Sequence, residues 1–308
     1  MPHSHQMSSL QNPSVDMVKR YFLISTDHLE DRIWFHDDDD FKAAMNMVAV
    51  AAFVLEIKIL DFTLMSNHVH FVVLATREDA KRFIDYFKLL YSKYYRNKYG
   101  IVKFLRGNVS DIREIEADGE SLERAISYVH MNCVAANICV YPYQYRWGCG
   151  GQFFSQRPME QGKCLGDISF RAQYSLLHTK VKLPPSFRIT PDGYIDPCSY
   201  IAVDRVERLF KTPKRFQYFL SQSSKARKRL SEEAMPSFRD QVILSSVNDL
   251  CKSLFRKECL EELTDDEQGE LLRQLRYRFS ADIAQLSRVT GIPYPRACSL
   301  IESFSNCS

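Results

Sequence analysis

The first half of the chain is predicted to form a small α/β or α+β sandwich that ends near residue 150, because short strand patterns alternate there with longer helical ones. Runs of apolar, β-favouring residues predict strands at residues 20–26, 55–65 and 68–75. Apolar residues at helical spacing predict helices at about residues 41–53, 78–99 and 121–136. Ser66 and Asn67 mark a turn, so the second and third strands are expected to pair as a hairpin.

The composition is that of a globular protein with two basic segments. The 308 residues are 45% hydrophobic and 26% charged, which allows a sizeable core, and the net charge of +3 does not by itself indicate a nucleic-acid partner. Residues 81–106, however, carry eight Lys or Arg against one acid, with tyrosines interleaved, and residues 205–229 carry nine against one. Both segments suit binding to phosphates, although a solvated helix face gives the same pattern.

The cysteine pattern favours a reducing compartment. The chain has nine cysteines, an odd number, and no pair has CxxC spacing, so neither a disulfide framework nor a zinc site is expected. No apolar run reaches about 18 residues, and we therefore expect a cytoplasmic protein with no membrane contact. Residues 1–17 are polar and are predicted to form a disordered tail.

The second half of the chain is predicted to be mainly helical. Residues 151–235 are interpreted as a connecting region with irregular structure and a basic helix, and residues 236–308 as a helical C-terminal domain. Within that domain, residues 280–301 resemble a helix-turn-helix with its turn at Gly291. Tyr294 and Arg296 would open its second helix, and we expect them to contact duplex DNA.

Two histidines stand close together in a strand that is otherwise apolar. The stretch FTLMSNHVHFVVLA, residues 62–75, contains His68 and His70. Side chains alternate across a strand, so these two imidazoles project from the same face and could grip a metal ion. The alternative is a pair of partly exposed surface histidines, because two-histidine motifs often arise without a metal.

The surroundings of the histidines resemble the signature of the HUH single-tyrosine transposases, which are IS200-like, and particularly the REP-associated tyrosine transposases. In that family the stretch usually reads Met-Pro-Asn-His-Val-His, and Ser66 stands here at the position of the proline. A second stretch, residues 125–137 (AISYVHMNCVAAN), resembles the family motif that carries the catalytic tyrosine. Residues 141–147 resemble the end of the family's catalytic domain, so the resemblance covers about residues 18–150.

The resemblance implies a fold and a set of site residues. The fold is a ferredoxin-like or RRM-like sandwich, an antiparallel sheet with helices on one side. Tyr128 is the implied nucleophile, and His68, His70 and Asn132 are the implied metal ligands, with Asn132 one helical turn after the tyrosine. Without the histidine motif, Tyr128 would be read as a half-buried helix tyrosine. Cys133 replaces the usual proline, which would let the helix run further and move Asn132.

The implied function is a metal-dependent endonuclease and strand transferase. It would act on single-stranded DNA beside a REP-like hairpin, through a 5′-phosphotyrosine, with Mg²⁺ or Mn²⁺ as the metal suited to mixed nitrogen and oxygen ligands. The protein would be associated with the bacterial nucleoid, as a monomer or a homodimer. The expected DNA contacts are Lys88, Lys93, Lys103 and Arg106. The alternatives are a catalytically silent DNA-binding regulator and an HUH replication initiator or relaxase.

Overall fold

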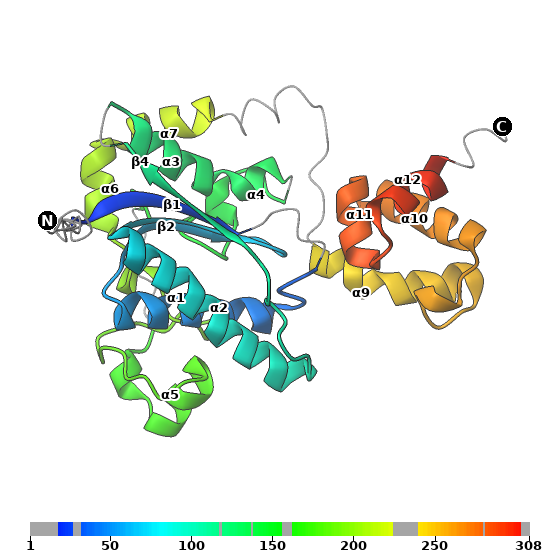
Figure 1. Ribbon diagram of the computed structural model, residues 1–308, viewed down its shortest axis with the longest axis horizontal. Coiled ribbons are helices and arrows are strands. Elements are labelled where there is room, and N and C mark those ends of the chain that lie inside the picture. Colours follow the sequence, from blue (N-terminus) through cyan, green and yellow to red (C-terminus); the bar gives the residue numbers. More distant parts are fainter. Residues whose placement is uncertain are drawn as a thin grey trace, which may run out of the picture.

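The computed structural model describes residues 18–26, 32–116, 119–136, 138–155, 162–223, 240–279 and 281–302. The predicted N-terminal tail lies outside these residues, as do the four basic residues 225 and 227–229 and the predicted boundary at residue 236. Figure 1 shows an N-terminal body built on a sheet and, beside one end of it, a smaller body made of helices. We call the latter the C-terminal helical region, residues 240–302.

The N-terminal body contains a four-stranded antiparallel sheet. Its strands are β1 (Arg20–Thr26), β2 (Lys58–Leu64), β3 (Val69–Ala75) and β4 (Ser110–Ile115), in the spatial order β2-β3-β1-β4. Helix α1 (Asp38–Val54) connects β1 to β2, and helix α2 (Arg77–Tyr99) connects β3 to β4. This is the βαββαβ order of the ferredoxin-like fold, and the predicted α+β class is confirmed.

Strand β4 was not among the predicted elements. Its sequence, SDIREI, is mostly polar, and it lies at the edge of the sheet with Asp111, Arg113 and Glu114 exposed. An edge strand packs on one neighbour only, so it needs little of the apolar pattern by which strands are recognised. It pairs with β1 along its whole length, from Ser110 opposite Thr26 to Ile115 opposite Tyr21.

Helices cover both faces of the sheet, not one side alone as predicted. On one face, Phe71 of β3 packs against Phe83 and Phe87 of α2. On the other, His70 lies beside Tyr128 of α3 (Ser121–His130). Figure 1 shows α1 and α2 on one side and α3 with α4 (Asn132–Ala135) on the other. The single helix predicted for residues 121–136 is therefore two, separated at Met131.

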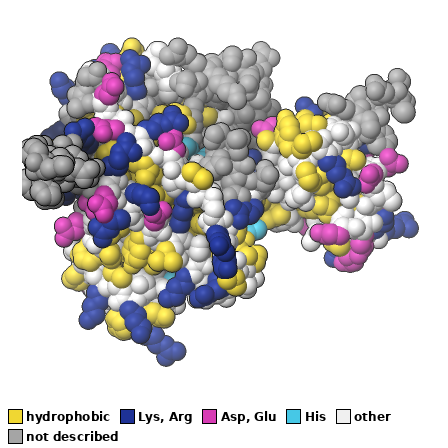
Figure 2. Space-filling view, in the orientation of Figure 1, with side chains coloured by type: hydrophobic (Ala, Val, Ile, Leu, Met, Phe, Trp, Pro, Cys, Tyr) yellow, Lys and Arg dark blue, Asp and Glu magenta, His cyan; other side chains and the backbone are white. Residues whose placement is uncertain are grey.

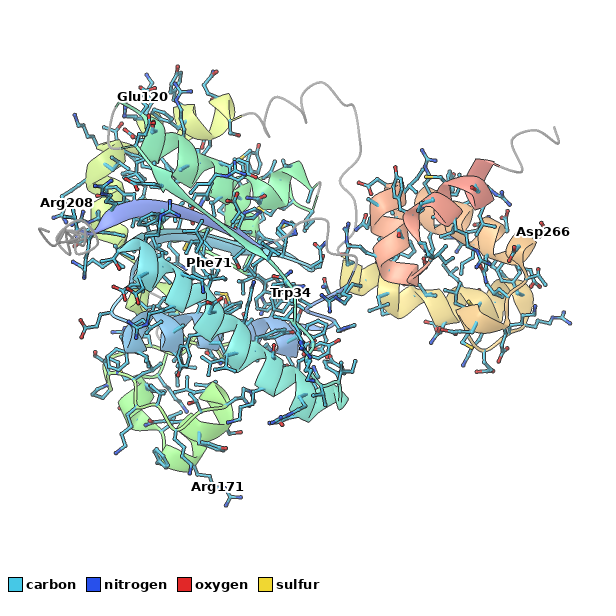
Figure 3. All side chains as sticks on the ribbon, viewed as in Figure 1. Trp34, Phe71, Glu120, Arg171, Arg208 and Asp266 are labelled. Carbon is cyan, nitrogen blue, oxygen red and sulfur yellow. The ribbon has the colours of Figure 1, made fainter. Side chains whose placement is uncertain are left out.

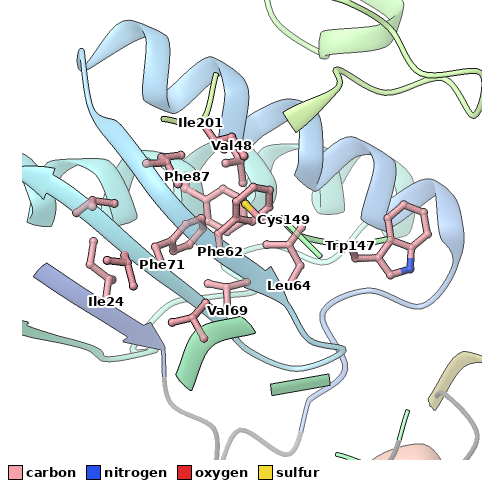
Figure 4. Close-up of a cluster of buried hydrophobic side chains, with 14 of the residues drawn as sticks. Ile24, Val48, Phe62, Leu64, Val69, Phe71, Phe87, Trp147, Cys149 and Ile201 are labelled. Carbon is pink, nitrogen blue, oxygen red and sulfur yellow. The ribbon is translucent and has the colours of Figure 1, made fainter. Parts of the chain in front are cut away.

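The main core lies between the sheet and the first two helices. Phe62 and Phe71 stack at its centre with their ring centroids 5.8 Å apart, and neither side chain is accessible to solvent. Figure 4 shows these rings with Val48 of α1 and Phe87 of α2 around them. The core also includes the buried Trp147. Its ring stacks on that of Phe41, near the start of α1, with the ring centroids 4.9 Å apart.

The segment between residues 162 and 223 packs around the N-terminal body. It contains short 3-10 turns and the helices α5 (Phe170–Leu177), α6 (Val203–Phe210) and α7 (Pro213–Gln222). Asn46 of α1 holds part of it, since its amide donates to the carbonyl of Leu176 and its side-chain oxygen accepts from the N–H of Ile195. The predicted irregular stretch thus contains one helix, α5, and the basic segment begins with α6 and α7.

The C-terminal helical region has its own core. It consists of α9 (Asp240–Leu250), a π-helical turn (Cys251–Phe255), a 3-10 turn (Leu260–Glu262), α10 (Asp265–Phe279), α11 (Ile283–Thr290) and α12 (Tyr294–Glu302). Gly291 ends α11 in the left-handed conformation with φ 71°, as the turn prediction required. The reading of α11 and α12 as a DNA-binding helix-turn-helix stays a prediction.

Two further properties concern the described residues as a set. Eight of the nine cysteines lie among them, and all eight are free thiols. Within the same residues, no helix combines the length and the apolar character that a membrane-spanning helix needs.

Candidate active site

The structure brings the four residues of the predicted catalytic set to one cavity. His68, His70, Tyr128 and Asn132 all line a space of about 300 Å³ between the end of β3, helices α3 and α4, and the C-terminal helical region. The turn before β3 forms one wall of the cavity and α11 forms another. Residues that are far apart in the sequence therefore meet at one place.

The two histidines stand side by side with their rings fixed. Their ring centroids are 4.9 Å apart and the planes are nearly perpendicular. The Nδ1 atom of His70 lies 2.8 Å from the hydroxyl oxygen of Ser25, and Nδ1 of His68 lies 2.8 Å from the side-chain oxygen of Asn67. Because Nδ1 of each ring is engaged in this way, Nε2 is the atom that could bind a metal ion.

The turn that carries His68 is held from several sides. The backbone oxygen of Ser66 accepts from the N–H groups of Trp34 and Phe35, at 2.7 and 3.2 Å, and the N–H of Met65 donates to the carbonyl of His68 at 2.8 Å. Ser66 and Asn67 are both buried. The turn is therefore buried and held by backbone hydrogen bonds, although Ser66 stands where the motif usually has proline.

A row of polar side chains crosses the sheet at the level of His70. In the strand register Thr63 of β2 lies opposite His70, His70 lies opposite Ser25 of β1, and Ser25 lies opposite Asp111 of β4. The hydroxyl of Thr63 donates to the carbonyl of Val129 at 3.0 Å and so ties the sheet to α3. Polar groups replace the usual apolar contact along this line between sheet and helix.

Tyr128 faces this row from α3. Its ring centroid lies 5.7 Å from that of His70, at an interplanar angle of 87°. Burial raises the pKa of the phenol above its ordinary value, while the nearby guanidinium of Arg113 on β4 acts to lower it. A second cavity of about 560 Å³ adjoins the tyrosine on the β4 side. Its lining includes Tyr128, His70, Arg113 and Asp111. Tyr128 and His70 therefore stand between two cavities.

Asn132 is held against the helix that carries the tyrosine. It is buried, and its Nδ2 donates to the carbonyls of Tyr128 and Val129 at 3.0 and 3.1 Å. The side-chain oxygen is then the atom of this amide that could serve as a ligand. The expectation that Cys133 would let the helix run further is wrong, because α3 ends at His130 and the buried Cys133 belongs to the short helix that follows.

His130 lies outside the cavity with the histidine pair and has a packing role. It is buried, its Nδ1 lies 3.0 Å from a carboxylate oxygen of the buried Asp61, and its ring packs edge-on against Phe216. The interpretation of His130 as a packing histidine is confirmed. Asp61 lies on β2, so the pair fastens α3 to the sheet.

The predicted metal ligands form a small donor set. Among the described residues, no group of three or more His, Cys, Asp or Glu side chains is placed to hold a metal ion. His68, His70 and Asn132 fall outside that pattern, because the third donor is an amide oxygen. Two imidazole nitrogens and one neutral oxygen fit a divalent ion that completes its shell with water or phosphate.

The predicted DNA contacts fall into two groups. Lys93, Lys103 and Arg106 are exposed, on α2 and in the loop that follows it. Lys88 is not available in the same way, since its side chain is mostly buried and its ammonium donates to the carbonyl of Asn108 and the hydroxyl of Ser110. It binds the loop to β4, and we remove it from the DNA contacts. Figure 2 shows Lys and Arg side chains scattered over the visible face of the N-terminal body, among hydrophobic and acidic ones.

The tyrosines of α2 serve mainly in packing. Tyr91 is inaccessible to solvent, as expected, and donates to the carbonyl of Trp34. Tyr94 and Lys98 both donate to the buried carboxylate of Asp40, at 3.1 and 2.7 Å. The acidic start of α1 thus neutralises part of the basic segment, which reduces its capacity for phosphate.

The two predicted residues of the C-terminal region lie on α12. Tyr294 is half exposed, and Arg296 is exposed and forms an ion pair with Asp265 at 2.7 Å. Neither residue lines the cavity with Tyr128. The cavity instead receives three side chains of the preceding turn and helix that were not predicted, Asp282, Gln285 and Arg288.

Comparison with known proteins agrees with the motif analysis. Residues 30–109 match the family model of the IS200-like transposases. This segment resembles IS200-like transposases. It contains both histidines and ends before Tyr128, and the match supports a transposase function. No curated protein matches the chain. A solved structure of a REP-associated tyrosine transposase bound to a REP hairpin is similar over 60% of this chain and 99% of its own, at 8% identity and a TM-score of 0.36, which is too low to extend the argument.

Proposed function

We propose that the protein is a metal-dependent single-stranded DNA endonuclease and strand transferase that acts beside a DNA hairpin. The observation that carries the proposal is the meeting of His68, His70, Tyr128 and Asn132 at one cavity. The IS200-like match of the segment that contains the histidines supports the same conclusion. The hairpin and the single strand come from the motif resemblance.

Tyr128 would be the nucleophile. Its phenol oxygen attacks a backbone phosphorus, the bond from phosphorus to the 3′-oxygen breaks, and a 5′-phosphotyrosine and a free 3′-hydroxyl result. A second 3′-hydroxyl can then attack the same phosphorus, which joins the strands and restores the phenol. One phosphodiester is exchanged for another, so no ATP is needed. A phenol is protonated at neutral pH, and burial raises the pKa of Tyr128 further, so the phenol proton has to leave as the new bond to phosphorus forms.

His68, His70 and Asn132 would hold the Mg²⁺ or Mn²⁺ ion. Such an ion, when bound, would neutralise charge on the scissile phosphate. The chain's own contribution is to keep the ligands in position. Ser25 and Asn67 fix the two imidazoles through Nδ1, and the backbone of α3 fixes the amide of Asn132. Preorganised ligands lose little entropy when the ion and the DNA arrive.

The first test is a cleavage assay with labelled single strands that carry hairpins from the flanks of the gene. In Mn²⁺ or Mg²⁺ the wild-type protein is expected to form a covalent adduct that survives a denaturing gel. Tyr128→Phe should abolish the adduct completely, because the nucleophilic oxygen is gone. Tyr218→Phe, which removes an exposed hydroxyl on α7, should leave it unchanged.

Two outcomes would overturn the proposal. An adduct that persists in Tyr128→Phe would place the nucleophile elsewhere. Tight binding of hairpins without an adduct on any strand would instead favour a DNA-binding regulator that has no chemistry.

A further inference from the structure

The C-terminal helical region meets the turn that carries His68 at a buried carboxylate. Asp240, the first residue of α9, is only 4% exposed. It accepts a hydrogen bond from the hydroxyl of Ser66, one from the amide of Gln285 at 2.8 Å, and two from the guanidinium of Arg288 at 3.1 and 3.3 Å. One carboxylate thus joins the active-site turn to α11.

This contact is part of a wider junction. The side-chain amide of Gln241 donates to the carbonyl of Phe35 at 2.6 Å, and Ile33 packs into the core of the C-terminal helical region. Figure 3 shows Trp34, whose neighbours make these contacts, at the end of the N-terminal body that faces the C-terminal helices. The position of α11 therefore depends on several contacts as well as on the carboxylate.

Helix α11 turns one face to the cavity of Tyr128. Asp282, Gln285 and Arg288 are spaced by three residues, so they share that face, and all three line the cavity. Of the described side chains that line it, Arg288 alone is a lysine or an arginine. Its side chain is 22% exposed, which leaves it partly open to an incoming ligand.

We propose that Arg288 binds a backbone phosphate of the single strand that occupies this cavity, while it remains in contact with Asp240. The guanidinium has five N–H donors in a planar fork, so it can hold the carboxylate and a phosphate together. Asp240 and Asp282 also line this cavity, and the positive charge of Arg288 offsets their repulsion of an anionic strand there. The C-terminal helical region is then a component of the active site. This inference rests on the proposed function, because it assumes that single-stranded DNA enters the cavity.

The test measures binding, so that it does not depend on cleavage. A short fluorescein-labelled oligothymidylate is titrated with the full-length protein, and anisotropy is followed over a range of salt concentrations. Arg288→Gln should weaken binding roughly tenfold and lower the slope of log affinity against log salt by about 0.7, the value for one contact to a phosphate of single-stranded DNA. Arg276→Gln, which changes an exposed arginine of α10 outside the cavity, should alter neither quantity.

A second variant separates phosphate binding from a role in holding the helices together. Asp240→Asn breaks the ion pair with Arg288 and removes a negative charge from the cavity, while it keeps the shape of the side chain and one of the two acceptor oxygens. If Arg288 binds phosphate, Asp240→Asn should bind the oligonucleotide as well as the wild type or more tightly. If the ion pair only holds α11 in place, both variants should weaken binding to the same extent, and that result would overturn the inference. Circular dichroism and thermal melts check that each variant is folded.

The remaining outcomes are distinguishable. An Arg288→Gln variant with unchanged affinity and salt slope would overturn this inference and leave the proposed chemistry intact. A wild-type protein that fails to bind the oligonucleotide would overturn both. A loss of binding in Arg288→Gln, in a protein that forms no tyrosine adduct, would support the phosphate contact and contradict the chemistry.

Discussion

The two faces of the sheet differ in what they bury. The face toward α1 and α2 is apolar, with Phe22, Phe62 and Phe71 inaccessible or nearly so. The face toward α3 carries the polar row that includes Ser25 and His70, together with Asp61. Both faces are closed over by helices, so the polar one needs a hydrogen-bond partner for each buried group. The side chains of His70, Thr63 and Asp61 each have one.

The same strand serves both faces. In β3 the odd positions from Val69 to Val73 pack into the core, while His70 lies under α3 and next to Tyr128. A substitution at position 70 should therefore reduce mainly activity, and one at position 71 should reduce mainly the stability of the fold.

The largest effect is expected for Phe71→Ala. Its ring is fully buried and touches Phe62, Phe83 and Phe87 at centroid distances of 5.8, 5.1 and 5.8 Å. Loss of the ring should lower the free energy of unfolding by about 3–5 kcal/mol, because it leaves a cavity in the core. Urea denaturation of the metal-free protein measures this. A loss below about 1 kcal/mol would show that the core collapses around the site.

The neighbouring variant, His70→Gln, should do the reverse. Adduct formation and Mn²⁺ affinity should each fall at least about a hundredfold, because one of the proposed ligands is lost. The free energy of unfolding should change by about 1 kcal/mol or less, since the side chain can still bond to Ser25. His178→Gln, on an exposed turn after α5, is the control. If the substitutions at positions 70 and 71 lowered the free energy of unfolding equally, the two faces of the sheet would not differ in their contribution to stability.

The sequence was sufficient for the parts of the molecule that follow a local rule. Alternation in residues 68–75 placed the histidines on one face, and the four-residue spacing brought Tyr128 and Asn132 to one cavity, although the helix is interrupted between them at Met131. β4 was missed because an edge strand can be mostly polar. Lys88 was misjudged because charge alone does not reveal that an ammonium binds a loop from within.

The wall formed by α11 could not have been predicted in this way. The contact of Asp240 with Ser66 joins positions 174 residues apart, and no local pattern in either segment encodes it. Ser66 gave the one available signal, because it replaces a proline of the motif with a residue that can donate a hydrogen bond. A departure from a family pattern can thus mark a contact with a part of the chain that lies outside the pattern.

The smallest effect is expected at Asp61, which tests whether every polar group on the α3 face serves the chemistry. Its carboxylate lies 3.0 Å from Nδ1 of His130 and accepts from the N–H of Phe62 at 2.8 Å, and it is fully buried. Asp61→Asn keeps the shape and an acceptor, so the free energy of unfolding should fall by only about 1 kcal/mol. Mn²⁺ affinity and the rate of adduct formation should stay at the wild-type level, because neither residue of this pair lines the cavity of Tyr128. Metal titration and the gel assay measure both. If activity fell while stability held, Asp61 and His130 would have to be counted with the catalytic residues, and the polar face would be one continuous site.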